Sequence, residues 1–229
     1  MRKEVKILGV IAVVVIIAAI FGANYYRKSI QSERVTTNNN SNKPKTNPEQ
    51  LVRPDSPTLG AADAKVTIVE FLDPECESCR AFNPAVKKIL QDYEGRVRLV
   101  VRYMPFHPNS LRAAAWTESA GEQGKYWQMQ EILFQRQSEW GAKHGPAAAS
   151  QAKPDVNAIF EKYAMELGLD IEKINKAVTE NRYTSKITRD QADGQSLGVT
   201  QTPTFFVNGR KLARLNEADL RLLIDEEMK

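Results

Sequence analysis

Residues 66–80, VTIVEFLDPECESCR, decide the fold that this chain is expected to adopt. The first seven are β-branched or apolar over the length of a strand, apart from Glu70, and they predict a central strand. Asp73 and Pro74 end this strand, and the motif CESC (residues 76–79) follows at the start of a segment with helical spacing. The two cysteines are therefore expected at a strand-to-helix turn.

The residues after this turn complete a β-α-β unit. Apolar residues recur near the helical period up to residue 93, with Pro84 inside the predicted helix and Gly95 at its end. Residues 97–104, VRLVVRYM, predict a second strand. Residues 109–197 are predicted to be almost entirely helical, with a loop around residues 141–153.

A second group of strands is predicted near the C-terminus. Residues 204–207 (TFFV) predict a strand, and Asn208-Gly209 is a strong hairpin signal that leads into a partner strand at residues 210–212. Residues 217–228 predict a closing amphipathic helix. The order indicates an α/β fold in which helices flank one sheet.

The composition allows one substantial domain and argues against nucleic-acid binding. The chain has 229 residues, 42% of them hydrophobic, and a formal net charge of +4. Its lysines and arginines are scattered among acidic residues, and no basic run is interleaved with aromatic residues. We therefore expect no nucleic-acid partner.

The N-terminus predicts a membrane anchor. Residues 7–23 are apolar or glycine, and Arg2, Lys3 and Lys6 precede them, so residues 1–26 are expected to form a cytoplasmic stub and a transmembrane signal-anchor. A cleaved signal peptide and a buried core helix are the alternatives. Residues 27–58 are polar and rich in Pro and Asn, which predicts a flexible tether before a folded domain at residues 59–229.

The chain has only two cysteines, Cys76 and Cys79. A zinc site would need four ligands, and no second pair of cysteines or histidines completes one, so we expect no metal. A structural disulfide across so short a loop would constrain the unfolded chain very little. A redox dithiol explains the spacing, because one helical turn brings both sulfurs within bonding distance. The helix N-terminus favours a Cys76 thiolate, and Cys79, one turn further, suits a resolving thiol.

Several separated motifs together resemble the thioredoxin superfamily, specifically its DsbA/DsbG-like branch. The resemblance covers residues 59–229. It rests on the strand before PECESCR, on Pro84 five residues after Cys79, on MPFHP (residues 104–108) before an alanine-rich helix, and on GVTQTPTFFVNG (residues 198–209). It implies a thioredoxin-like fold, a central mixed sheet flanked by helices, with a helical block inserted at about residues 108–184.

The resemblance also implies roles for three residues besides the cysteines. Pro203 would be a cis-proline beside the dithiol, at the start of a strand where its missing N–H costs least. Thr202 would face the dithiol and pair with a substrate peptide. Glu70 would be a buried acid beneath the dithiol, with a raised pKa and a part in proton transfer. The alternatives are a trans bond at Pro203 and an exposed strand position for Glu70.

The flanking residues bear on the acidity of the dithiol. Glu75 and Glu77 would disfavour a thiolate, so we expect the pKa of Cys76 and the reduction potential of the dithiol to lie closer to those of thioredoxin than to those of DsbA. His107 is expected to be a turn or capping residue rather than a catalytic one. The tryptophans of the helical segment are expected to form its core.

The expected function is protein thiol–disulfide exchange on the periplasmic or cell-surface side of a membrane, with oxidation of exported proteins as the favoured direction. The expected partners are unfolded or partly folded exported polypeptides and a membrane protein that reoxidises or reduces the dithiol. No cofactor motif is visible. The alternatives are a reductase or isomerase with a restricted set of clients, and a non-catalytic, chaperone-like binding module on the same fold.

Overall fold

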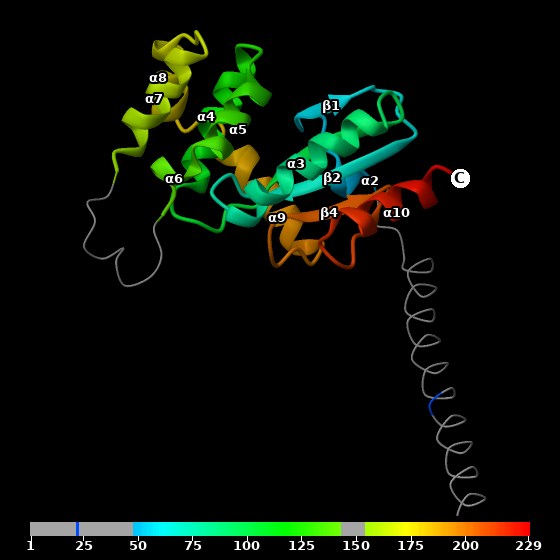
Figure 1. Ribbon diagram of the computed structural model, residues 1–229. Helices are drawn as coiled ribbons and strands as arrows, with labels where there is room; N and C mark the ends of the chain where they lie inside the picture. Colours follow the sequence, from blue (N-terminus) through cyan, green and yellow to red (C-terminus); the bar gives the residue numbers. More distant parts are fainter. Residues whose placement is uncertain (1–21, 23–47, 143–153) are drawn as a thin grey trace, which may run out of the picture. The chain divides into compact units, whose positions relative to one another are not determined.

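The computed structural model describes residues 22, 48–142 and 154–229 (Figure 1). Contacts divide the chain into two units, Met1–Pro44 and Lys45–Lys229, and the fold lies in the second. The predicted membrane span at residues 7–23 lies outside the described residues, apart from Gly22, as does the predicted tether up to residue 47. Among the residues that the structure describes, no helix has the length and apolar character needed to cross a membrane.

A mixed sheet of five strands, in the order β1-β3-β2-β4-β5, forms the centre of the second unit. Strand β2 pairs with β3 in parallel, whereas β1, β4 and β5 are antiparallel to their neighbours. The strands are β1 (Thr58–Gly60), β2 (Val66–Leu72), β3 (Val97–Tyr103), β4 (Thr204–Val207) and β5 (Arg210–Lys211). Together with the flanking helices, this sheet confirms the predicted thioredoxin-like α/β fold.

Helices connect and cover these strands. Helix α3 joins β2 to β3, a series of helices lies between β3 and β4, and α10 closes the chain (Figure 1). Their bounds are α2 (Pro48–Leu51), α3 (Glu77–Asp92), α4 (Ser110–Glu122), α5 (Tyr126–Gln135), α6 (Gln137–Trp140), α7 (Val156–Glu166), α8 (Ile171–Thr179), α9 (Thr184–Ser196) and α10 (Glu217–Glu227). Within the described residues, the predicted helical character of residues 109–197 is confirmed, and the helix predicted at residues 217–228 is confirmed to within about one residue.

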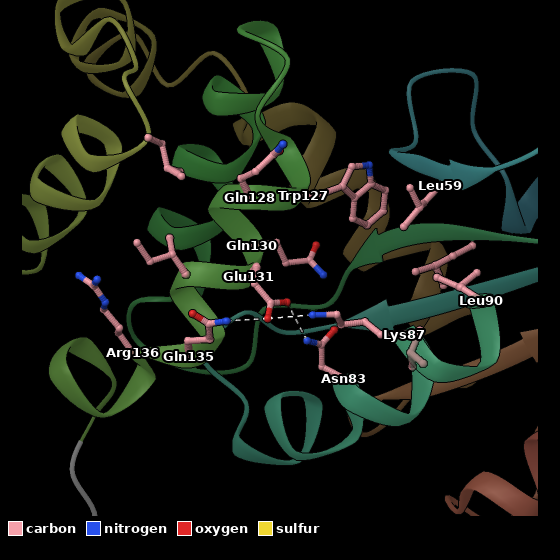
Figure 2. Close-up of a pocket in the computed structure, with 14 residues that line it drawn as sticks. Leu59, Asn83, Lys87, Leu90, Trp127, Gln128, Gln130, Glu131, Gln135 and Arg136 are labelled. Carbon is pink, nitrogen blue, oxygen red and sulfur yellow. Dashed lines mark hydrogen bonds and ion pairs between the residues drawn. The ribbon is translucent and has the colours of Figure 1, made fainter. Parts of the chain in front are cut away.

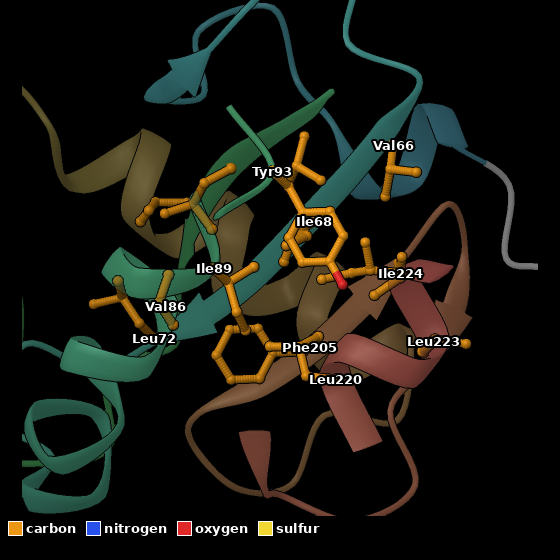
Figure 3. Close-up of a cluster of buried hydrophobic side chains, with 14 of the residues drawn as sticks. Val66, Ile68, Leu72, Val86, Ile89, Tyr93, Phe205, Leu220, Leu223 and Ile224 are labelled. Atoms are coloured by element: carbon orange, nitrogen blue, oxygen red, sulfur yellow. The ribbon is translucent and has the colours of Figure 1, made fainter. Parts of the chain in front are cut away.

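Alternate residues of the central strands face opposite sides of the sheet, and each side has its own hydrophobic core. On one side Ile68 and Leu72 pack against Ile89 of α3 and Ile224 of α10 (Figure 3). On the other side the core contains buried side chains from α2, β2, β3, β4 and the segments that follow β3 and α9: Leu51, Val69, Phe71, Val100, Met104, Val199 and Phe206. Because β2 is covered on both faces, its sequence is nearly continuous in apolar residues.

The helices between β3 and β4 have a core of their own, built around aromatic side chains. Trp116 and Trp140 are almost fully buried, and each packs edge-on against Phe160, with ring centroids 5.9 and 5.0 Å apart. For these two tryptophans the prediction of a core rather than a ligand site is confirmed, whereas Trp127 is only partly buried and lines a cleft between α3 and α5.

The hairpin between β4 and β5 turns at Asn208 and Gly209, whose φ angles are +45° and +87°. Two successive positive φ angles are what a tight hairpin turn of this hand requires, and Asn and Gly tolerate them best. The Asn208 side chain also accepts a hydrogen bond from the backbone N–H of Thr67, at 2.9 Å, and so ties the turn to β2. The predicted hairpin is confirmed.

The last residues assigned to the flexible tether pack on the domain instead. Leu51 of α2 is 1% exposed, and the Arg53 guanidinium forms two hydrogen bonds with Asp193 of α9, at 2.8 and 2.9 Å. Strand β1 then pairs with β3 from Thr58 onward. Residues 48–58, which the polar composition assigned to the tether, therefore belong to the folded domain.

Candidate active site

The dithiol lies where β2 ends and α3 begins. Cys76 is the N-cap of α3, with extended backbone angles, and its N–H donates to the Asp73 carbonyl at 3.0 Å. Cys76 is 8% exposed and Cys79 is fully buried, and both are free thiols. Only Cys76 can therefore be reached by a substrate sulfur, which matches the roles predicted for an attacking and a resolving thiol.

Hydrogen bonds directed at the Cys76 sulfur lower its pKa to about 5. The largest contribution is the hydrogen bond from the Cys79 thiol, opposed by partial burial, and a hydrogen bond from the Thr202 side chain adds to it. The backbone N–H groups of Ser78 and Cys79, at the N-terminus of α3, contribute further. Each of these donors stabilises the thiolate over the thiol.

Cys79 and Glu70 are shifted in the opposite direction. Burial raises the pKa of Cys79 well above its ordinary value, and the hydrogen bond with Cys76 and the charge of Glu70 raise it further. Burial also raises the pKa of Glu70 to about 8, and the negative charge of Cys76 adds to the effect. Glu70 is 4% exposed, as predicted. It lies close enough to both cysteines to interact with their charges.

The loop before β4 lies against the dithiol. The peptide bond between Thr202 and Pro203 is cis, which confirms the prediction, and Pro203 is buried. The Thr202 carbonyl oxygen lies 3.4 Å from the Cys76 sulfur. The structure thus brings together all five predicted site residues: Glu70, Cys76, Cys79, Thr202 and Pro203.

The influence expected of the acidic neighbours is not found. Glu75 is buried, and its carboxylate accepts hydrogen bonds from Asn109 N at 2.6 Å, Asn109 Nδ2 at 2.9 Å and Ala142 N at 2.7 Å. Glu77 is exposed to solvent. Neither is among the main influences on the pKa of Cys76, which is about 5. This value lies between those of thioredoxin, about 7, and DsbA, about 3.5, so the expectation of a pKa nearer to thioredoxin stays a prediction. The strong influence expected of the acidic neighbours was wrong, because it counted their charges without their hydrogen bonds and exposure.

Asp73 is a site residue that sequence reasoning missed. Its carboxylate is fully buried and accepts hydrogen bonds from the backbone N–H groups of Glu75 and Phe106, at 2.8 and 2.7 Å. It also contacts His107 Nδ1 at 2.7 Å and the Ser110 hydroxyl. The available signal was a carboxylate at the carboxyl end of a central strand, three residues before a cysteine at a helix N-terminus.

Two clefts lie near α3. The larger, of about 520 Å³, lies between α3 and α5 and contains neither cysteine (Figure 2). Glu131 of α5 bridges it by hydrogen bonds with Lys87 at 3.0 Å and Asn83 at 3.3 Å (Figure 2). The smaller, of about 270 Å³, is lined by Glu75, Glu77, Arg80 and residues after α5, and so adjoins the dithiol. Within residues 48–142 and 154–229, no group of three or more His, Cys, Asp or Glu side chains could hold a metal ion.

The fold and the dithiol define the class of the thioredoxin-like oxidoreductases, whose DsbA-like members carry out thiol–disulfide exchange. The chain belongs to the thioredoxin family Thioredoxin_4, whose model matches residues 53–226.

Solved structures of this class are similar over most of the domain. A thioredoxin-like oxidoreductase from Silicibacter pomeroyi is 28% identical, with a TM-score of 0.64, and the match covers 80% of this chain and 98% of that one. Oxidised BdbD from Bacillus subtilis is 23% identical, with a TM-score of 0.64 and coverage of 80% and 96%. Wolbachia pipientis α-DsbA1 is 21% identical, with a TM-score of 0.65 and coverage of 77% and 92%. The last two similarities concern the fold alone.

Similar sequences also occur within longer proteins. The chain is 36% identical to the Na(+)/H(+) antiporter NhaA 3 of Salinispora tropica over 155 residues, which are 66% of this chain and 21% of the antiporter. It is 32% identical to the NhaA antiporter of Herminiimonas arsenicoxydans over 153 residues, 67% of this chain and 22% of the antiporter. The chain spans about a fifth of the length of these relatives, so antiporter activity does not carry over to it.

Proposed function

We propose that this chain is a membrane-anchored, extracytoplasmic thiol–disulfide oxidoreductase that oxidises exported proteins. The feature that supports this direction is the position of Cys76 at the N-terminus of α3 beside the Cys79 thiol, where hydrogen bonds lower its pKa to about 5. A stabilised thiolate favours the reduced dithiol, which makes the disulfide form a stronger oxidant and Cys76 a good leaving group. The apolar segment at residues 7–23, with basic residues before it, supports the anchor.

The proposed reaction is a two-step disulfide exchange. A substrate thiolate attacks the Cys76 sulfur, a mixed disulfide forms, and the Cys76–Cys79 bond breaks. Cys79 leaves as a thiolate and takes up a proton, which the buried carboxyl of Glu70 can supply. A second substrate thiolate then attacks the substrate sulfur of the mixed disulfide and releases the Cys76 thiolate. The substrate gains a disulfide, and two electrons remain on the dithiol for a membrane redox partner to remove.

The deciding experiment is thiol trapping of the full chain in its own membranes, by acid quench and a mass-tagged alkylating reagent. We expect Cys76 and Cys79 to be mostly disulfide-bonded at steady state. If the two cysteines are mostly free thiols, the proposed oxidase is wrong, and the protein is a reductase or isomerase that receives electrons through the membrane.

A Cys76→Ser variant separates catalysis from binding. The variant should lose all turnover of reduced, unfolded substrate proteins, because no mixed disulfide can form at the reachable position. If it still protects such substrates from aggregation and the wild type shows no turnover, the chain is a chaperone-like binding module.

A further inference from the structure

The loop between β3 and α4 is fastened to both sides of the turn that carries Cys76. On one side, the Asp73 carboxylate accepts hydrogen bonds from the backbone N–H groups of Phe106 and His107, at 2.7 and 3.2 Å. On the other side, the Glu75 carboxylate holds the backbone and the side chain of Asn109. Two carboxylates that flank the attacking cysteine therefore fix the position of this loop.

The imidazole of His107 is aimed at one of these carboxylates. His107 Nδ1 lies 2.7 Å from the buried Asp73 carboxylate, while 30% of the His107 side chain is exposed. Asp73 is also bound to the turn by its carbonyl, which accepts from Cys76 N. The imidazole is thus held beside the turn by a residue that contacts Cys76 directly.

The charged groups that act most on the pKa of His107 are anionic. Partial burial lowers the pKa of His107, but the hydrogen bond to Asp73 and the charges of Asp73, Cys76 and Glu75 outweigh it and raise the pKa above its ordinary value. The neighbouring contacts of the loop are uncharged: the Ser110 hydroxyl accepts from His107 N, and the Gln191 amide of α9 donates to the Pro105 carbonyl. An imidazolium at this position has anions as its only charged partners among these residues.

We propose that His107 is a positioning residue for the dithiol: held by Asp73, its imidazolium neutralises a buried carboxylate and stabilises the Cys76 thiolate. The inference rests on the proposed exchange reaction and explains why the dithiol tolerates a fully buried carboxylate three residues before Cys76. Without the imidazolium, Asp73 would keep its hydrogen bonds from backbone N–H groups and from Ser110, but its net negative charge would disfavour a second negative charge in the same turn.

The first test follows the ionisation of Cys76 through the pH dependence of its alkylation rate in the reduced protein. His107→Gln should raise the pKa of Cys76 by about one unit, which is about tenfold less thiolate at a pH below that pKa. Ser110→Ala is the matched control, because it removes another hydrogen bond of Asp73 but no charge, and it should leave the pKa within about 0.2 units of wild type. Equal pKa values in all three proteins would overturn the proposal.

A coupling test shows whether Asp73 acts together with His107. In an Asp73→Asn background, His107→Gln should change the pKa of Cys76 by much less than it does in wild type, because the carboxylate it neutralises is gone. Equal effects in the two backgrounds would contradict the pairing of the two residues.

A second measurement needs no folding-sensitive variant. Because the interaction between two charges is reciprocal, the pKa of His107 should fall when the dithiol is oxidised and the Cys76 thiolate is lost. NMR titration of the reduced and oxidised wild-type protein measures this, and His144→Gln assigns the signals, because the chain has two histidines. An unchanged His107 pKa would overturn the proposal. Loss of exchange with reduced substrates, with the pKa linkage intact, would instead contradict the proposed function.

Discussion

At the scale of single residues, hydrogen bonds and burial give two thiols in one helical turn very different pKa values. Cys76 receives hydrogen bonds and its pKa falls to about 5, whereas burial raises the pKa of Cys79 well above its ordinary value. Cys79 donates the hydrogen bond that does most to stabilise its neighbour. The same hydrogen bond therefore activates one thiol and keeps the other protonated until a disulfide forms.

Thr202→Val should raise the pKa of Cys76 by about one unit, because a hydrogen bond to a charged sulfur is worth about 1.5 kcal/mol or more. The less stable thiolate should also lower the reduction potential, measured by equilibration with glutathione. The exposed Thr200→Val is the matched control and should behave like wild type. Identical potentials for both variants would show that the Thr202 hydroxyl has no part in stabilising the thiolate.

Glu70→Gln should slow the release of Cys79 from the disulfide by about tenfold or more, because an amide cannot exchange a proton with the leaving thiolate. In the wild type the rate of this step should change with pH around 8, where Glu70 titrates, and the variant should lose that dependence. Rapid-mixing kinetics of mixed-disulfide formation and decay measure both effects. A variant with an unchanged pH profile would assign the proton transfer to another group.

The core of this site follows from local sequence, whereas its surroundings do not. The spacing of the cysteines was recognisable from nearby residues, and the buried acid and the cis-proline followed from the motifs that resemble the DsbA/DsbG-like branch. The contacts of Asp73 and Glu75 were not, since their partners Phe106 and Asn109 lie 33 and 34 positions further along the chain. The influence expected of Glu75 on the pKa of Cys76 was misjudged for this reason.

At the scale of elements, a buried ion cluster joins α2, β3 and α9. Arg102 is fully buried, and its guanidinium contacts Asp190 at 2.9 Å, the Asp193 carboxylate, and the Leu51 carbonyl at 2.7 Å. Arg53 contacts Asp193 from the other side. Such a cluster tolerates the loss of one member poorly, because the remaining charges stay buried.

Arg102→Met should lower the free energy of unfolding by about 3–5 kcal/mol, because it keeps most of the apolar stem but leaves buried carboxylates without their cation. Arg98→Met, on the same strand, is the control: Arg98 bonds to the Thr67 hydroxyl and the Ala62 carbonyl near the surface. The free energy of unfolding of the Arg98→Met control should fall by no more than about 1 kcal/mol. Chemical denaturation gives both values, and equal losses would contradict a special role for the buried cluster.

The elements that sequence reasoning missed are those with little apolar surface to signal them. The residues of β1 are all exposed, and this strand forms by pairing with β3 at the sheet edge rather than by burial. Helix α2 buries Leu51 within a stretch rich in Pro and Asn. The long apolar runs of β2 and β3 and the Asn208-Gly209 turn were predictable because their patterns are local.

At the scale of the whole molecule, redox state and stability are linked through Cys76. Its pKa in the folded, reduced protein is about 5, below the ordinary thiol value of 9.0. The stability from this ionisation is therefore fully present above about pH 9 and is lost as the pH falls to about 5. The disulfide form has no such thiolate, whereas the shift of Glu70 due to burial affects both forms.

We therefore expect the reduced form to gain stability relative to the disulfide form as the pH rises from about 5 to about 8. Denaturation of both forms at several pH values measures the difference in their free energies of unfolding. At neutral pH, Thr202→Val should make the reduced form less stable relative to the disulfide form than it is in wild type, because the substitution raises the pKa of Cys76. A difference that does not vary with pH would contradict the low pKa of the Cys76 thiol.

The attachment of α2 to α9 has a mechanical consequence. Leu51 and Arg53 are fixed to the sheet face opposite α3, the helix that carries the dithiol. A pull on the chain before Pro48, such as drag from a bulky client, loads the Arg53–Asp193 ion pair and the Leu51 core first. A force entering from that end must break these contacts before it reaches Cys76, so the attachment of α2 to α9 protects the turn where bonds are exchanged.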